Sequence, residues 1–200
     1  MKKFLFFLLL LAQITFSQEL TYYLGMRSSK YAYIGVQPFK HWGVVYENSL
    51  FAQDMNLQYG RISLIYSFDI PFGLKGYYSF FYGMRYNNDY YDLGTVLNCE
   101  AALYSRFLWV NGVLQPRYDS DIKGMLGYSL SLKMMFFRDI GLTAGIKNLP
   151  EYRNVERRFF AGFVFETDHL KVMPEISTPL SIEMETTRVS VSFVYENSIL

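Results

Sequence analysis

Cysteine, histidine and proline are all scarce in this chain of 200 residues, which has one cysteine, Cys99, 2 histidines and 6 prolines. A single cysteine excludes an intramolecular disulfide framework, so stability must come from elsewhere. Two histidines far apart in the sequence match no metal-ligand spacing, and no glycine-rich phosphate loop follows a strand and opens a helix. We therefore expect no cofactor, metal or nucleotide.

The chain also lacks a charge excess and a long apolar segment. Its 19 Lys and Arg residues balance 18 Asp and Glu residues, so nothing indicates a nucleic-acid partner. No segment reaches the roughly 20 apolar residues of a transmembrane helix, because the run from Phe4 to Ala12 is too short and later segments are interrupted. A helical membrane protein is therefore not expected.

The first residues have the pattern of a secretory signal. Lys2 and Lys3 form a basic start, the apolar run follows, and small residues up to Ser17 complete a cleavage pattern. We expect cleavage after Ser17. The chain then divides into a signal peptide at 1–17 and a single β-barrel domain at 18–200.

Apolar and polar residues alternate through most of that domain. From Leu74 to Tyr86 every even position is apolar, aromatic or glycine, whereas Lys75 and Ser79 hold odd positions. Side chains two apart share a strand face, so this pattern predicts a long strand with one uncharged face. The pattern recurs along the domain and predicts strands at 20–26, 31–36, 41–50, 57–68, 74–86, 93–105, 106–117, 124–137, 140–147, 157–166, 169–182 and 187–196.

Turn residues and hairpin geometry support this division. Every aspartate, Asp92 and Asp119 included, falls in or beside a predicted turn. Residues opposite each other across a hairpin must point to the same face, which predicts three apolar pairs. They are Leu103 with Leu108, Phe136 with Ile140, and Phe165 with Leu170. These tight turns lie at one end and longer links at the other, as in transmembrane barrels.

The uncharged face decides between a membrane barrel and a soluble β-sandwich. In a sandwich this face would fill one thin core, where tyrosine hydroxyls need partners. Here it carries Tyr46, Tyr66, Tyr78, Tyr82 and other aromatic residues, which are easier to place against lipid and at the membrane interfaces. We predict an all-β fold: a closed antiparallel up-and-down transmembrane β-barrel of about 12 strands, with about 10 as the alternative. A soluble secreted β-sandwich that binds a ligand is the remaining hypothesis.

The signal peptide ending Thr-Phe-Ser, the period-two strands and the segment Val-Ser-Val-Ser-Phe-Val-Tyr at 189–195 resemble the small outer-membrane β-barrels of Gram-negative bacteria. The resemblance is one of architecture. It implies an outer-membrane location, with membrane lipid and the outer-membrane assembly machinery as partners. The link at 148–154 mixes aromatic and charged residues and is the candidate contact for a protein partner at the extracellular loops.

Charged side chains on the opposite face would line the interior of such a barrel. They are Glu47, Arg61, Lys75, Arg85, Glu100, Arg117, Lys133, Lys147, Arg158, Glu166, Lys171, Glu175, Glu183, Arg188 and Glu196. Either these residues form ion pairs in a filled barrel, or they line a narrow channel. We favour the filled interior, because Tyr23, Tyr77, Phe81, Trp109 and Phe137 are also expected to point inward.

Catalysis has little support in the sequence. A lipid-modifying enzyme would need a nucleophile beside a base, and the candidates are His41 and His169 with Ser177 or Ser181. Nothing in the sequence places a serine against a histidine. We therefore expect a protein that is not an enzyme, serving as a structural or accessory outer-membrane barrel or as a narrow channel. A lipid-modifying barrel enzyme is the alternative.

The expected cleavage can be tested on protein isolated from cell envelopes. The mature chain should begin at Gln18, because the small-residue pattern ends at Ser17. Intact mass and N-terminal sequencing of the purified protein measure this directly. Retention of Met1 in the membrane-inserted form would show that no signal peptide is removed.

Overall fold

The computed structural model describes residues 20–50, 58–70, 73–87, 89–104, 107–121, 123–148, 157–180 and 187–199. Within these residues the chain forms twelve antiparallel strands, as the alternation predicted. Among the described residues, no helix is long and apolar enough to cross a membrane. The strands are β1 (Leu20–Arg27), β2 (Tyr31–Gln37), β3 (Trp42–Ser49), β4 (Tyr59–Ile70), β5 (Leu74–Arg85), β6 (Tyr91–Tyr104), β7 (Leu108–Asp119), β8 (Lys123–Met135), β9 (Ile140–Lys147), β10 (Arg158–Glu166), β11 (Leu170–Pro179) and β12 (Arg188–Ile199).

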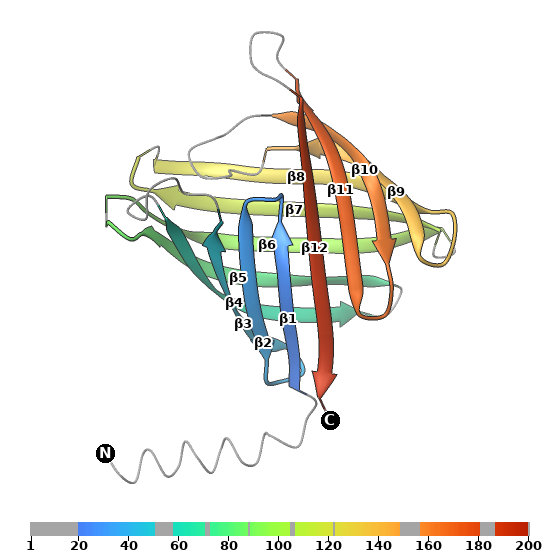
Figure 1. The fold of residues 1–200 in the computed structure, drawn as a ribbon, viewed down its shortest axis with the longest axis horizontal. Coiled ribbons are helices and arrows are strands. Elements are labelled where there is room, and N and C mark those ends of the chain that lie inside the picture. Colours follow the sequence, from blue (N-terminus) through green and yellow to red (C-terminus); the bar gives the residue numbers. More distant parts are fainter. Residues whose placement is uncertain are drawn as a thin grey trace.

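Each strand pairs with its neighbours in sequence, and the first strand pairs with the last. β1 and β12 lie side by side, with Leu24 opposite Tyr195, and this contact closes the sheet into a barrel (Figure 1). The predicted closed antiparallel barrel is confirmed, and the β-sandwich hypothesis is wrong. We call the end that carries the links at 50–58, 148–157 and 180–187 the loop end, and the end with the turns at 136–139 and 167–169 the short-turn end.

The distribution of polarity is the reverse of that in a soluble protein. On β8, Leu126, Leu130 and Leu132 are exposed on the outer face, whereas Ser131 and Lys133 are buried on the inner face. The other strands repeat this pattern, so large apolar side chains cover the outside and charged groups lie inside. Such a surface is stable against lipid and would be an aggregation hazard in water.

Aromatic side chains on the outer face gather at two levels. Near the short-turn end, the rings of Trp42 and Tyr66 lie 5.0 Å apart. Near the loop end, the hydroxyls of Tyr46 and Tyr86 form a 2.8 Å hydrogen bond. Tyr78, on β5, and Tyr86, which directly follows β5, mark the two levels and are eight positions apart. Eight positions span about 26 Å along a strand, or about 20 Å along the axis of a barrel with tilted strands. Two aromatic levels at this spacing fit the girdles of a membrane barrel.

The hairpin predictions are partly right. The backbone N–H of Phe136 donates to the carbonyl of Ile140 at 3.0 Å, so that predicted pair is confirmed. The other two registers were wrong. Leu108 lies opposite Tyr104, because an irregularity between Ala102 and Tyr104 shifts the register of β6. In the next case Phe165 lies opposite Val172, since the turn is one step further along the chain, at Asp168 and His169.

The outer face should tolerate charge at its edge but not at its centre. We expect Leu130→Arg to destabilise the inserted barrel by about 2–4 kcal/mol, because Leu130 is exposed midway along β8, where a membrane barrel would meet the hydrocarbon. Leu126→Arg is the matched control: it lies on the same face of β8, nearer the loop end, and should cost about 0–1 kcal/mol. Urea unfolding in lipid vesicles measures both. Equal losses would show that the outer face is not graded by membrane depth.

Candidate functional site

The interior of the barrel is the region where charged groups gather. The fourteen predicted lining residues that fall within the described ranges all lie on strand faces that point inward, and Glu183 lies outside the described residues. Five of them are buried: Glu47, Arg85, Arg117, Lys133 and Arg158. They divide into a group near the loop end and a group near the short-turn end.

In the loop-end group, Glu47 is held between two arginines. Its carboxylate lies 2.7 Å from the guanidinium of Arg27 and 3.2 Å from that of Arg61. Glu47 and Arg61 are register partners on β3 and β4, whereas Arg27 reaches over from β1. A carboxylate that is shared by two guanidinium groups in this way stays charged although it is buried.

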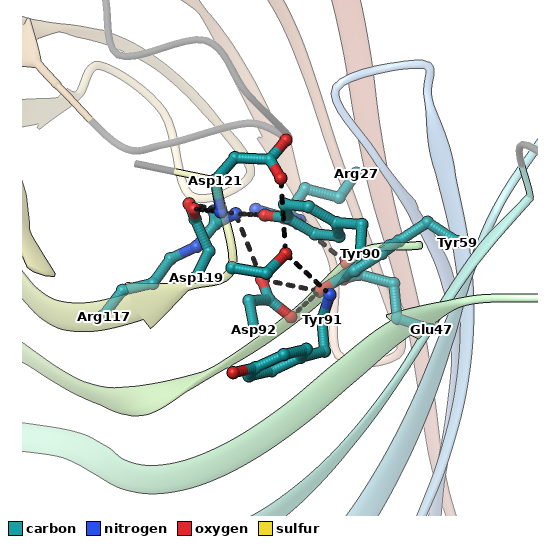
Figure 2. Close-up of polar contacts among 10 residues, drawn as sticks. Arg27, Glu47, Tyr59, Tyr90, Tyr91, Asp92, Arg117, Asp119 and Asp121 are labelled. Carbon is teal, nitrogen blue, oxygen red and sulfur yellow. Dashed lines mark hydrogen bonds and ion pairs between the residues drawn. The ribbon is translucent and has the colours of Figure 1, made fainter. Parts of the chain in front are cut away.

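A second set of contacts centres on Arg117. Its guanidinium lies 3.2 Å from Asp92 and 3.5 Å from Asp119, and both carboxylates are almost completely buried. The hydroxyl of Tyr59 donates to Asp92, with oxygen to oxygen distances of 2.7 and 3.0 Å. Figure 2 shows these side chains pointing toward one another from β4, β6 and β7. Removing one member of such a buried set typically costs about 3–5 kcal/mol, because an uncompensated charge is left behind.

Three tyrosine rings adjoin these ion pairs. Tyr31, Tyr59 and Tyr90 are buried and form a cluster with centroid distances of 6.3 and 6.2 Å between successive rings. Tyr90, which directly precedes β6, has no solvent exposure, and Arg117 donates a hydrogen bond to its hydroxyl. Burial raises the pKa of the Tyr90 hydroxyl above its usual value, so the ring stays neutral.

The short-turn group is built from lysines and glutamates. Lys133 lies 2.5 Å from Glu100 and 3.5 Å from Glu166, and Lys171 is also 3.5 Å from Glu166. The ammonium groups of Lys75 and Lys133 each lie 5.1 Å from the centroid of the Trp109 ring. These contacts join β5, β6, β7, β8, β10 and β11 through the interior.

The remaining predicted lining residues lie on the later strands. Lys147 pairs with Glu175, which lies two strands away, and Arg158 donates to the hydroxyl of Ser177 at 3.2 Å. Arg188 lies opposite Ser177, and Glu196 lies opposite Tyr23.

Between the two charged groups the interior is occupied by uncharged side chains. Four such side chains point away from the outer surface and are buried: Ser79, Phe81, Val96 and Gln115. Phe81 therefore fills volume as predicted. Phe137 does not: it was expected to point inward, but it lies beyond the end of β8 and is 71% exposed.

Sequence reasoning missed the most buried acids of the site. Asp92 and Asp119 were expected in or beside turns, just outside the strands predicted at 93–105 and 106–117, whereas they are the second residue of β6 and the last residue of β7. Both sit at strand ends, where aspartate is tolerated, and Arg117 forms an ion pair with each of them. The alternation of the sequence could have revealed them. Asp92 is an even number of positions from the inward residues of β6, and Asp119 is an even number of positions from those of β7. Arg27 was missed because β1 was predicted to end at residue 26.

The candidate catalytic residues are not brought together. His41 and His169 lie at the short-turn end, and each ring hydrogen bonds through Nδ1 to a backbone carbonyl, that of Ser67 at 2.9 Å and that of Glu196 at 3.2 Å. Ser177 instead contacts Arg158. Ser181 lies outside the described residues. Within the described ranges, no group of three or more His, Cys, Asp and Glu side chains could hold a metal ion.

The candidate protein contact at 148–154 is described only at Asn148, whose side chain is buried. The rest of that segment lies outside the described residues, so its role stays a prediction.

The structure of this chain is distantly similar to solved structures of other proteins. No protein family matches the chain, and no curated protein does. Among solved structures, LpxR from Salmonella typhimurium is similar over 90% of this chain and 99% of its own, with 6% sequence identity and a TM-score of 0.40. At that level the likeness carries no activity over to this chain. The barrel itself confirms the expected architectural resemblance to small outer-membrane barrels.

One expectation from the sequence is corrected by this comparison. The chain was expected not to be an enzyme, and this exclusion is not kept beside the likeness to LpxR. The sequence argument rested on the lack of a visible serine and histidine pair, and a barrel can hold catalytic groups that such a pattern does not reveal. The exclusion of catalysis is therefore dropped.

The contact between Tyr59 and Asp92 depends on a glycine. A Cβ added to Gly83 would lie 2.1 Å from the Tyr59 hydroxyl and 2.3 Å from an Asp92 carboxylate oxygen. We expect Gly83→Ala to destabilise the barrel by about 1–3 kcal/mol, since the pair must move apart inside a packed interior. The midpoint of urea unfolding in lipid vesicles measures the loss.

Gly112→Ala is the matched control, because a Cβ there has nothing within 4 Å. It should leave the midpoint unchanged or slightly raised, as glycine is an unfavourable strand residue. A Gly83 variant as stable as this control would show that the cluster does not hold this part of the barrel.

Proposed function

We propose that this protein is an integral barrel of the Gram-negative outer membrane whose interior is closed, so that it works at the membrane without serving as an open diffusion pore. The observation that carries the proposal is the combination of an apolar outer face with interior charges that are joined to one another across the barrel.

The outer face supports the membrane location. Leucine and phenylalanine side chains such as Leu64, Phe80 and Phe163 are about half exposed, which in water would be unfavourable over so large an area. Aromatic residues concentrate at the two levels where a bilayer has its interfaces. Membrane lipid is therefore the proposed partner of this surface, and the outer-membrane assembly machinery is the proposed partner during insertion.

The inner face supports a closed interior. A pore needs fixed charges that face water and attract ions. Here Glu47, Lys133 and Glu175 each contact an opposite charge, and several of these pairs join strands that are not neighbours in the sheet. The buried ring of Phe81 lies under the guanidinium of Arg61 at 4.9 Å and occupies the space between the two charged groups.

The proposal predicts an electrically silent protein. Purified, refolded protein in a planar lipid bilayer at neutral pH should show no steady ionic current, because paired charges and buried aromatic rings fill the interior. A porin run under the same conditions is the positive control. Steady conductance by the wild-type protein would contradict the closed interior, whatever the sign of the ion that carries it.

A further inference from the structure

We propose that Tyr31, Tyr59 and Tyr90 form a lid that closes the barrel at its loop end, while the short-turn end of the interior stays open to water. The inference rests on the closed barrel proposed above and adds which end is closed and which side chains close it.

The three rings come from strands that are not neighbours. Tyr31 is the first residue of β2, Tyr59 is the first residue of β4, and Tyr90 directly precedes β6. Their rings meet edge to face, at 75° between Tyr31 and Tyr59 and at 61° between Tyr59 and Tyr90. The rings thus bridge β3 and β5 on the inside of the barrel rather than lying flat along one strand.

Each ring is fixed by a charged partner from the wall. The guanidinium of Arg27 lies 5.0 Å from the centre of the Tyr31 ring, and that of Arg85 lies 5.8 Å from the centre of the Tyr90 ring. Tyr59 and Tyr90 are further held through their hydroxyls by Asp92 and Arg117 (Figure 2). Rings held by guanidinium groups, and two of them also through their hydroxyls, form a rigid cluster and not a loosely packed surface patch.

The two ends of the interior differ in their access to water. At the loop end, the side chains of Arg117 and Asp92 are 3% and 1% exposed. At the short-turn end, those of Lys171 and Glu166 are 29% and 34% exposed, although they too form an ion pair. Arg27, the last residue of β1, is the exception at the loop end, with a side chain that is 33% exposed. The low exposure of Arg117 and Asp92 therefore indicates that water is excluded below the rim of the loop end, beside the tyrosine rings.

Removing the lid should therefore open the barrel. Because Phe81 also occupies the interior, each variant is made in a Phe81→Ala background, which should itself stay silent. In that background we expect Tyr90→Ala to show a steady current in planar bilayers, and Tyr31→Ala to do the same. Tyr90→Phe should stay silent, because the ring and not the hydroxyl fills the opening. Tyr91→Ala is the matched control: it is the next residue, it faces outward and its ring contacts Tyr118. It should also stay silent.

The outcomes separate the lid from the closed barrel. Conductance by the wild-type protein would contradict the proposed function itself. If the wild-type protein is silent and both alanine variants insert as heat-modifiable barrels but are silent too, only the lid is overturned. Failure of both variants to fold would also overturn it, because the tyrosines would then be a folding core and not a removable closure.

Discussion

In the proposed membrane location, the requirement that every backbone N–H and C=O be paired inside a bilayer governs the rest of this structure. An open sheet in lipid would leave two unpaired edges, so the first and last strands must meet. They do so through β1 and β12, which are joined along a ladder that runs from Leu20 opposite Ile199 to Met26 opposite Phe193. Once the sheet is closed, each strand has one face toward the outside and one toward the interior, and the period-two pattern of the sequence becomes a separation of apolar from charged groups.

Closure also determines how the charges are satisfied. Side chains such as Arg27 and Lys133 point into a confined space, where desolvation would be costly without partners. The structure meets this by placing an acid within reach of each: Glu47 for the first and Glu100 and Glu166 for the second. The same contacts that satisfy the charges fill the interior, so the stability of the barrel and its closure have a common origin. Gly83 contributes by leaving room for the Tyr59 hydroxyl beside Asp92.

Most of the fold could be predicted from the sequence, because alternation fixes which face of a strand is outward. It placed Leu130 outside and Lys133 inside, and it gave strand limits close to the observed ones. The interior contacts could not be predicted in the same way. Arg27 and Glu47 meet only when β1 and β3 curve toward each other, and Asp92 was placed just outside the strand predicted at 93–105 because aspartate disfavours strands. The registers at Tyr104 and Phe165 depend on details of the turns, which periodicity does not specify.

The central claim is that the chain is a closed barrel embedded in the outer membrane through its apolar outer face. Cell fractionation combined with electrophoresis before and after boiling tests it most directly, since a folded membrane barrel resists detergent until it is heated. The account predicts recovery in the outer-membrane fraction, as a band that changes its mobility when the sample is boiled. Recovery as a soluble periplasmic protein, with a mobility that boiling does not change, would contradict it.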